Sequence, residues 1–273
     1  MATRTCFHHT DRETGRSCTR CGRPACSDCL HDAPVGAHCW QCIKAAQPPA
    51  GARLRMWNAR NPAVVTRVLL AVNVGVFLLT LADGATLSGA GGSLQQRLAL
   101  IASGVAAGEW YRLVTSGFVH YGLLHLAFNM VLLYRLGEAL EGDLGHVRFT
   151  ALYFASLLCG SYGAVLVSPN ALTAGASGAV FGLVAAVAIG QRSRGVDVWR
   201  HGVGGLLALN LLFTFLDRNI SIGGHLGGLA AGAIVGAAMF HGGTGRRAVA
   251  IGVVVAVVVG AVAVVLAEAA AGA

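Results

Sequence analysis

Long apolar segments dominate this chain and constrain its fold more than any other feature. Seven of them, each 15 to 21 residues long, are expected to form helices. A segment of about twenty apolar residues crosses roughly 30 Å of hydrocarbon, and the whole chain is 55% hydrophobic and only 12% charged. The sequence therefore predicts an all-α polytopic membrane protein. The expected helices cover about residues 64–82, 120–140, 149–168, 177–191, 201–216, 221–240 and 248–267.

The distribution of arginine between the connecting loops predicts the orientation. With a cytoplasmic amino terminus, seven arginines fall in inside loops and three in outside loops, as the positive-inside rule favours. We therefore expect a multi-pass protein of a bacterial plasma membrane with a cytoplasmic amino-terminal domain and an outside carboxyl terminus. No cleaved signal peptide is expected, because the first sixty residues are polar and cysteine-rich. The inside set is Arg135, Arg148, Arg192, Arg194, Arg200, Arg246 and Arg247, and the outside set is Arg97, Arg112 and Arg218.

A cysteine-rich head precedes the apolar segments. Seven of the eight cysteines lie within the first 42 residues and form, with one histidine, four pairs that each enclose two residues. This spacing lets both members of a pair bind one tetrahedral zinc ion, so the head is expected to hold two structural Zn²⁺ ions. The pairs are Cys6 with His9, Cys18 with Cys21, Cys26 with Cys29, and Cys39 with Cys42.

Several alternatives remain open for this head. The first and third pairs can share one ion in a cross-braced order, or neighbouring pairs can share ions sequentially. His8, His31 and His38 compete with His9 as the histidine ligand. A disulfide framework is disfavoured by the metal-type spacing and by a reducing cytoplasm. Cys159 lies alone in an apolar segment, where it is expected to fill the core.

The net charge of +8 is concentrated toward the amino terminus. Residues 1–61 carry nine Lys or Arg against four Asp or Glu, and such a basic arm suggests nucleic acid or acidic lipid as a partner. Two zinc ions with seven thiolates would lower the charge of this region to about +2. No nucleic-acid partner is therefore expected.

Polar side chains inside the apolar segments are the candidates for function, because they are costly at membrane depth. Ser177 opens the fourth segment, His225 lies near the start of the sixth, and His125 and Asn129 lie four residues apart in the second. From a cytoplasmic start these three segments all begin outside, so the four side chains are expected near one membrane face. His125 and Asn129 share a helix face, and with the free N–H of Ser177 they provide three donors suited to an oxyanion hole.

A serine and a histidine are suited to nucleophilic catalysis if their helices approach closely. Small residues four apart allow such an approach, and they mark both the fourth and the sixth segments. We expect His225 to act as the base for Ser177 and Phe181 to pack against the imidazole. Because no Asp or Glu lies inside these segments, a two-residue Ser–His unit is expected. The small residues are Gly178 and Gly182 in the fourth segment and Gly224, Gly228, Gly232 and Gly236 in the sixth.

The connection from residue 83 to residue 119 is long, rich in glycine near Gly89–Gly92, and has no clear structure in the sequence. Trp110 and Tyr111 near its end are residue types that lie at the lipid headgroups. We expect an outside loop in the membrane interface, although ordinary aromatic anchoring explains these two residues equally well.

The polar residues form an ordered set that resembles the signature of the rhomboid family of intramembrane serine proteases, over about residues 64–241. The resemblance implies a six-helix core with Ser177 as nucleophile and His225 as general base and acid. It implies that His125, Asn129 and the Ser177 N–H bind the oxyanion. Tyr111 stands where a tryptophan often precedes the arginine, and Phe181 stands where some members have tyrosine. The set is Tyr111-Arg112, His120, His125, Asn129, Gly175-Ala176-Ser177-Gly178, and His225 with Gly228 and Gly232.

The resemblance also implies supporting roles for other members of the set. His120 and Gly175 would support the oxyanion site and the outer loop, and Arg112 would help to fix that loop. The remaining members, Phe181, Gly228 and Gly232, would be structural. The head resembles B-box-type zinc fingers over about 37 residues, which implies an interaction module with a protein partner.

These inferences predict a B-box-like double zinc-binding domain at 1–45, a linker at 46–62, a six-helix core at 63–241, and a cytoplasmic loop with a seventh helix at 242–273. The resemblance implies an endopeptidase that hydrolyses peptide bonds of transmembrane substrates through an acyl-enzyme, without a cofactor for catalysis. The alternatives are an inactive rhomboid-like protein that binds membrane helices, and a transporter that uses its membrane histidines as a relay. A metalloprotease is disfavoured, because the chain has no His-Glu-x-x-His motif.

Overall fold

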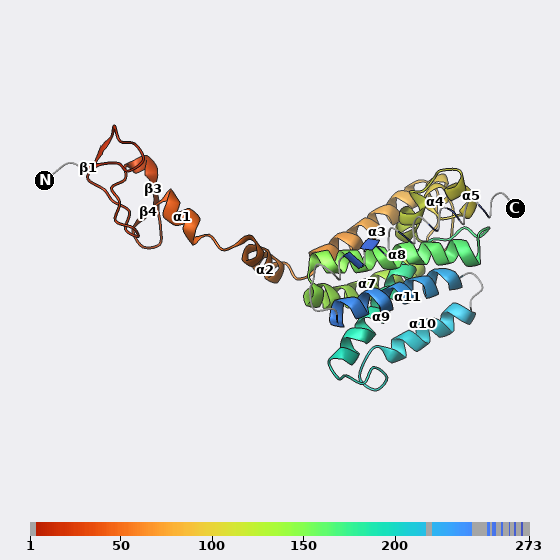
Figure 1. Cartoon of the computed structure of the whole chain (residues 1–273). Helices are drawn as coiled ribbons and strands as arrows, with labels where there is room; N and C mark the ends of the chain where they lie inside the picture. The colour runs from red at the N-terminus through yellow and green to blue at the C-terminus, as the bar shows by residue number, and fades with distance from the viewer. Residues whose placement is uncertain are drawn as a thin grey trace. The chain divides into compact units, whose positions relative to one another are not determined.

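The protein is described by a computed structural model (Figure 1). It describes the backbone of residues 4–216 and 220–241 and of scattered helical positions between 250 and 269. The chain divides into two compact units, Met1–Trp57 and Asn58–Ala273. The seventh helix, expected at 248–267, falls largely outside the described residues.

The amino-terminal unit is built on two short hairpins. Strand β1 (Arg4–Thr5) pairs antiparallel with β2 (Glu13–Thr14), and β3 (Leu30–Asp32) pairs antiparallel with β4 (Ala37–Cys39). The 3-10 turn η1 (Ser27–Cys29) leads into β3, and helix α1 (Trp40–Ala46) follows β4. The buried cluster of this unit consists of three cysteines and one alanine. A core this small needs help from disulfides or metal ions to hold a domain together.

Helix α2 (Ala50–Arg60) occupies most of the stretch expected to be a linker at 46–62. Pro62 lies between this helix and the first long apolar helix, α3 (Val64–Ala82). Because the residue before a proline disfavours the helical conformation, the sequence itself marks the break between the two helices.

The carboxyl-terminal unit consists of packed helices. Four are long and apolar enough to cross a membrane, namely α3, α7 (Leu123–Leu144), α8 (His146–Val167) and α11 (Ile222–His241). Two shorter helices complete the set, α9 (Ser177–Ser193) and α10 (Gly204–Leu216). The six core helices expected from the apolar pattern are therefore present, with ends shifted by up to four residues. The expected all-α fold is confirmed.

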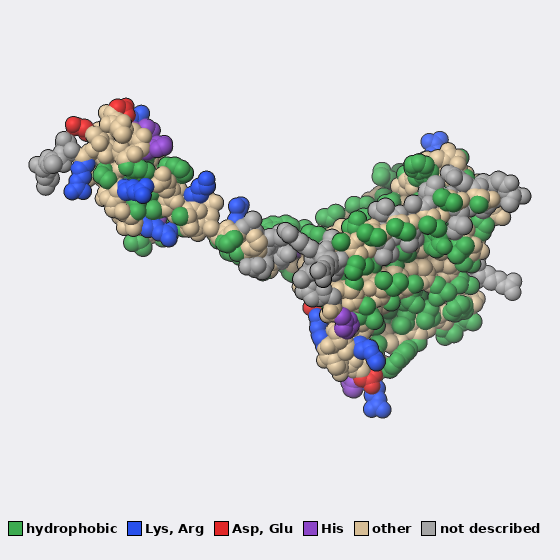
Figure 2. All heavy atoms as spheres, viewed as in Figure 1, with side chains coloured by type: hydrophobic (Ala, Val, Ile, Leu, Met, Phe, Trp, Pro, Cys, Tyr) green, Lys and Arg blue, Asp and Glu red, His purple; other side chains and the backbone are tan. Residues whose placement is uncertain are grey.

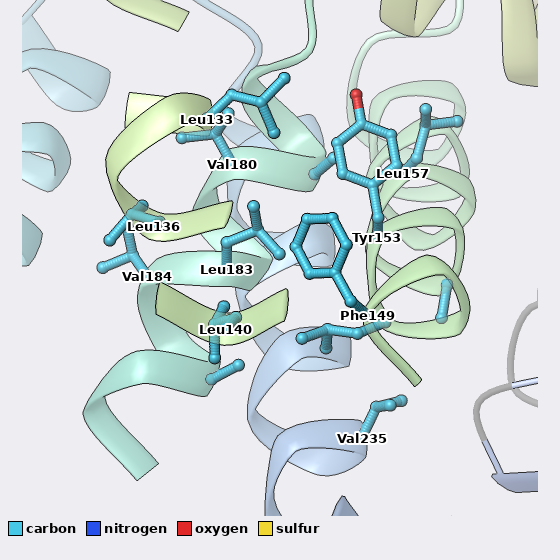
Figure 3. Close-up of a cluster of buried hydrophobic side chains, with 14 of the residues drawn as sticks. Leu133, Leu136, Leu140, Phe149, Tyr153, Leu157, Val180, Leu183, Val184 and Val235 are labelled. Carbon is cyan, nitrogen blue, oxygen red and sulfur yellow. The ribbon is translucent and has the colours of Figure 1, made fainter. Parts of the chain in front are cut away.

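The core of this unit lies between α7, α8 and α9, and α11 packs against α8 and α9. Aromatic rings from α8 fill the centre between leucines and valines of the neighbouring helices (Figure 3). The buried residues labelled there are Leu133, Leu136 and Leu140 from α7, Phe149, Tyr153 and Leu157 from α8, Val180, Leu183 and Val184 from α9, and Val235 from α11.

Hydrophobic side chains also cover the visible outside of the helical unit (Figure 2). Leu124 and Phe128 on α7 and Leu212 and Phe215 on α10 are all more than half exposed. Charged side chains gather instead at one end, over the connection between α9 and α10 (Figure 2). A bilayer covers an apolar outer surface of this kind, and four of the helices are long and apolar enough to cross it. The chain is therefore an integral membrane protein.

The connection from residue 83 to residue 122 differs from expectation, because it is ordered into short helices. These are α4 (Ser93–Leu98), α5 (Ala102–Ala106), α6 (Arg112–Thr115) and the 3-10 turn η2 (Ser116–Phe118). Arg112 provides a physical reason for this order, since it is buried and its Nη1 donates to the carbonyls of Gln96 and Ala99 at 2.6 Å each. Its Nε pairs with Glu109 at 2.6 Å. One side chain thus joins α6 to the end of α4 and to the turn that precedes α6.

The same connection holds the segment that precedes α9. Leu100 and Thr173 exchange two backbone hydrogen bonds of 2.8 Å, and Gly175 N–H donates to Ser116 O at 2.9 Å. These bonds bring residues before α7 and residues before α9 to the same end of the unit. They fix the backbone on both sides of the turn that leads to Ser177.

Glu141, near the carboxyl end of α7, caps the amino end of α3. Its carboxylate accepts from the backbone N–H groups of Val65 and Thr66 at 2.8 Å and from the Thr66 hydroxyl at 2.6 Å, and it is hydrogen-bonded to His146 Nδ1. A carboxylate at a helix start satisfies N–H groups that have no partner in the helix. Glu141 is 1% exposed, so it is a structural element that the apolar pattern did not reveal.

Candidate active site and metal-binding groups

Gly175 lies beside both Ser177 and His125. Its φ of +128° is in the region that favours glycine. A Cβ atom on this residue would lie 2.7 Å from His125 Nε2 and 3.6 Å from Ser177 Oγ. The hydroxyl of Ser177 and the ring of His125 therefore both flank the Cα of Gly175, on the turn between the α8–α9 connection and α9.

The orientation of His125 follows from its other ring nitrogen. The backbone N–H of Tyr121 donates to His125 Nδ1 at 3.4 Å, which leaves the proton of a neutral imidazole on Nε2. This Nε2–H is the group beside Gly175. It is therefore available as a hydrogen-bond donor next to Ser177.

His120 supports the same turn from a fully buried position. Its Nε2 accepts from the backbone N–H of Ala176 at 3.4 Å, and its ring packs edge-on against His125 with centroids 5.0 Å apart. The carbonyl of His120 accepts from Gln95 Nε2 at 2.9 Å. His120 thus connects helix α4 of the outer connection to the residue immediately before Ser177.

Helices α9 and α11 are in backbone contact beside Ser177. A Cβ atom on Gly228 would lie 1.9 Å from Gly178 O, and one on Gly232 would lie 2.0 Å from Gly182 O. Any side chain at these positions would push the helices apart. Their close approach places His225, one turn before Gly228, next to the first turn of α9.

Phe181 defines the plane of the His225 ring. The two rings stack with centroids 4.1 Å apart and an interplanar angle of 20°, and both residues are buried. Phe181 lies one turn after Ser177 on α9, so the imidazole lies along the helix face that carries the hydroxyl.

Two of the expected contacts are absent among the described residues. The Ser177 hydroxyl and the His225 imidazole are not hydrogen-bonded, which is common for catalytic pairs without substrate. Asn129 is buried, but its Nδ2 donates to His125 O at 2.9 Å, one turn back in its own helix. An amide NH₂ carries a second hydrogen, so this bond still leaves Asn129 one donor.

Thr214 is a residue of the site that the sequence did not reveal. Its Oγ1 lies 2.7 Å from His225 Nδ1, and it is 1% exposed on α10. A threonine in an apolar helix gives no signal of its own. A search for a polar residue on the fifth segment, facing the histidine of the sixth, would have found it.

Arg112 and Glu109 give the outer connection its charged contact. The guanidinium of Arg112, by hydrogen bond and charge, lowers the pKa of the Glu109 carboxyl. Trp110 and Tyr111, between them, are exposed. The Tyr111 hydroxyl donates to Glu109 at 3.4 Å, and the exposed faces of both aromatic rings can contact lipid headgroups.

In the amino-terminal unit, the four sequence pairs come together as two groups of four ligand atoms, each within 4.8 Å of one another. Cys6, His9, Cys26 and Cys29 form one group, and Cys18, Cys21, Cys39 and Cys42 form the other. This is the cross-braced order rather than the sequential one, and His9 rather than His8, His31 or His38 completes the first group. All eight cysteines lie among the described residues, and none of them forms a disulfide.

The donor chemistry of the first group fits a metal ion. Burial raises the pKa of Cys6, but backbone hydrogen bonds around it outweigh this and lower the pKa to about 6. Burial and the neighbouring Cys6 and Cys26 thiols raise the pKa of Cys29 to about 12. Crowded sulfurs of this kind are stabilised together by a bound cation, which replaces their protons. The unit can therefore hold two metal ions.

Comparison with known proteins identifies the helical unit. The family model described as "Rhomboid domain" matches residues 107–242, a range that contains every membrane candidate residue above. Rhomboid protease GluP of Bacillus subtilis (strain 168) is 36% identical over 162 residues, which are 57% of this chain and 32% of that protein.

Two further relatives give the same result. Putative rhomboid protease YdcA of Bacillus subtilis (strain 168) is 36% identical over 139 residues, 47% of this chain and 67% of that protein. RHOMBOID-like protein 5 of Arabidopsis thaliana is 34% identical over 155 residues, 53% of this chain and 47% of that protein. The matches thus span from about a third to two thirds of these relatives. The chain belongs to the rhomboid family.

Proposed function

We propose that this protein is an intramembrane serine endopeptidase that cleaves transmembrane substrates with Ser177 as nucleophile and His225 as general base and acid. Two observations together support the proposal: Ser177 Oγ and His125 Nε2 flank the same glycine, Gly175, and Phe181, one turn after Ser177, stacks on His225. Relatives named as rhomboid proteases give further support.

In the first half of the proposed reaction, Ser177 Oγ attacks the carbonyl carbon of the scissile peptide bond and its proton passes to the His225 imidazole. The negative oxygen of the tetrahedral intermediate receives hydrogen bonds from the His125 Nε2–H, from Asn129 and from the Ser177 N–H. Donors placed in this way contribute about 3 to 4 kcal/mol each when essential. The C–N bond then breaks, and the imidazolium returns the proton to the leaving amine.

In the second half, water attacks the acyl-enzyme and gives a proton to His225. The bond between the acyl carbon and Ser177 Oγ breaks, and the serine recovers its proton. The site needs water from the nearby membrane face. The positions of Ser177 and His225 in the first turns of their helices support such access. By resemblance, substrates are membrane helices that unwind easily and carry small residues at the cut.

A second candidate function is an inactive rhomboid-like protein that binds membrane helices without cutting them. Such a protein would not require a hydrogen bond between Ser177 and His225, and none joins them in the described part of the chain. The donors around Gly175 and the stacked ring of His225 favour the protease, because helix binding alone requires neither.

For the amino-terminal unit we propose two structural Zn²⁺ ions, held by the two ligand groups described above. Thiolate and imidazole ligands in a tetrahedral set of four are typical of structural zinc. The proposed domains are a zinc-binding unit at 1–45, a linker at 46–62, a protease core at 63–241 and a carboxyl-terminal segment at 242–273. We propose that the zinc unit is cytoplasmic and binds a protein partner. The arginines near the α9–α10 connection support this orientation.

Cleavage of a model transmembrane substrate in proteoliposomes tests the proposal. We expect Ser177→Ala and His225→Ala each to reduce cleavage to the level of protein-free vesicles, because each removes a group on which bond breaking depends. Cys159→Ser changes a buried side chain of α8 that takes no part in the proposed reaction, so it is the matched control and should retain cleavage. Undiminished cleavage by Ser177→Ala would refute the protease assignment.

A further inference from the structure

Residues 212–216 at the end of α10 expose four apolar side chains and bury one polar side chain. Leu212, Phe213, Phe215 and Leu216 are exposed, whereas Thr214 among them is 1% exposed. Polar groups are costly in such a helix unless they find partners. The partners of Thr214 therefore indicate its purpose.

Thr214 makes two hydrogen bonds. Its Oγ1 lies 2.7 Å from the carbonyl oxygen of Asn210 and 2.7 Å from His225 Nδ1. Its hydroxyl donates to the carbonyl of Asn210, four residues earlier, and its Oγ1 also contacts His225 Nδ1. A hydroxyl has one hydrogen and two lone pairs. When the hydrogen is directed to Asn210 O, Oγ1 meets the histidine as an acceptor, and His225 Nδ1 then carries the proton.

A proton on Nδ1 leaves the other ring nitrogen, Nε2, with a free lone pair in neutral imidazole. Nδ1 is held by α10 and one ring face is covered by Phe181. Tautomer and ring rotation are thus both set by residues other than the serine. In many serine hydrolases a buried carboxylate has this role, but the site described here contains none.

We propose that Thr214 is a positioning residue that holds His225 in the Nδ1-protonated tautomer, so that Nε2 is ready to accept the proton of Ser177. This inference rests on the proposed function for its kinetic consequence, but the tautomer itself is a property of the resting protein. It also links α10 to the reaction, since any movement of this helix away from α11 breaks the bond to His225.

The test compares Thr214→Val, which replaces the hydroxyl by a methyl group of similar size, with Thr214→Ser, which keeps the oxygen. Thr80→Val is the matched control, because Thr80 is also fully buried in an apolar helix and donates to a carbonyl of its own helix, Phe77 O, at 2.8 Å. Nitrogen-15 NMR of histidine-labelled protein, with the His225 signal assigned by its loss in His225→Ala, reports which nitrogen carries the proton. Substrate cleavage gives kcat and KM.

We expect Nδ1–H in the unmodified protein, in Thr214→Ser and in Thr80→Val, and a mixture of tautomers in Thr214→Val. Loss of one neutral hydrogen bond predicts a fall in kcat of about 2- to 10-fold for Thr214→Val, with KM unchanged, and near-normal kcat for the other two variants. A His225 protonated on Nε2 in the unmodified protein would overturn the proposal even if Thr214→Val failed to fold. An unchanged tautomer in folded Thr214→Val would also overturn it. If no serine-dependent cleavage occurs at all, the protease assignment fails, and the NMR result still decides the role of Thr214.

Discussion

The arrangement around Ser177 depends on a residue without a side chain. Gly175 has a positive φ and lies against His125, and a Cβ atom there would come within 2.7 Å of Nε2 and 2.8 Å of Cε1. A methyl group must therefore displace the imidazole that we propose as an oxyanion donor. Strain in the backbone adds about 1 to 2 kcal/mol.

We expect Gly175→Ala to reduce kcat by about 100-fold, the loss typical of a displaced oxyanion donor, while the helical unit stays folded. Gly195→Ala separates strain from displacement, because Gly195 also has a positive φ, of +74°, but has open space around it. This control should lose some thermal stability and keep its kcat. Equal kcat values for the two variants in the proteoliposome assay would show that His125 does not act from its position beside Gly175.

At the scale of elements, the contact between α9 and α11 brings the two catalytic candidates together. Gly228 contacts the carbonyl of Gly178 so closely that a Cβ atom would lie 1.9 Å from its oxygen. Backbone atoms cannot move aside as a flexible side chain can, so the helices must separate. Separation draws His225 away from Ser177.

We therefore expect Gly228→Ala to lower both the melting temperature and kcat, with kcat falling at least about tenfold because sub-ångström placement matters in catalysis. Gly75→Ala is the control, since Gly75 lies within α3 with nothing near its Cα, and replacing glycine by alanine in a helix is neutral or stabilising there. Thermal unfolding and cleavage measured on the same preparations would check this. A Gly228→Ala protein as active and as stable as Gly75→Ala would contradict the packing described above.

The helices were predictable from the sequence because membrane spans need long apolar segments, and this signal is local. Ser177, His125, Asn129 and His225 were found in the same way, as polar exceptions within those segments. Their contacts were not predictable in detail, and Asn129 bonds within its own helix rather than to Ser177.

Contacts between distant segments account for what the sequence did not reveal. Glu141 accepts hydrogen bonds from residues about 75 positions earlier, and no spacing rule connects them. Arg112 orders the outer connection by donating to two backbone carbonyls. Because every residue has a backbone carbonyl, the sequence does not indicate which ones accept. The contact of Thr214 with His225 depends on how α10 packs beside α11, which the sequence does not show.

At the scale of the whole molecule, a cysteine-rich unit that could hold metal ions and a membrane unit share one chain. The small cysteine core of the first unit suggests that metal binding supplies most of its stability, whereas the second unit is held by helix packing. The two units should therefore respond differently to metal removal.

We expect the purified protein to release two equivalents of zinc per chain on denaturation, and Cys18→Ser to release about one, because it damages only one ligand group. Cys159→Ser is the control, since that thiol lies in α8 and outside both groups, and it should release two. A chelator should make residues 1–57 sensitive to protease while the melting temperature of the helical unit stays unchanged. A protein that binds no zinc, or that loses zinc through Cys159→Ser, would contradict the proposed sites.

The proposed protease activity depends on Ser177 being a nucleophile activated by His225. Labelling with a fluorophosphonate probe tests this most directly, because the probe forms a covalent bond with an activated serine and needs no knowledge of the substrate. We expect one labelled site in the 273-residue chain, located at Ser177 by mass spectrometry, and loss of labelling in both Ser177→Ala and His225→Ala. Labelling that persists in either variant, or an unmodified protein that folds but takes no label, would contradict it.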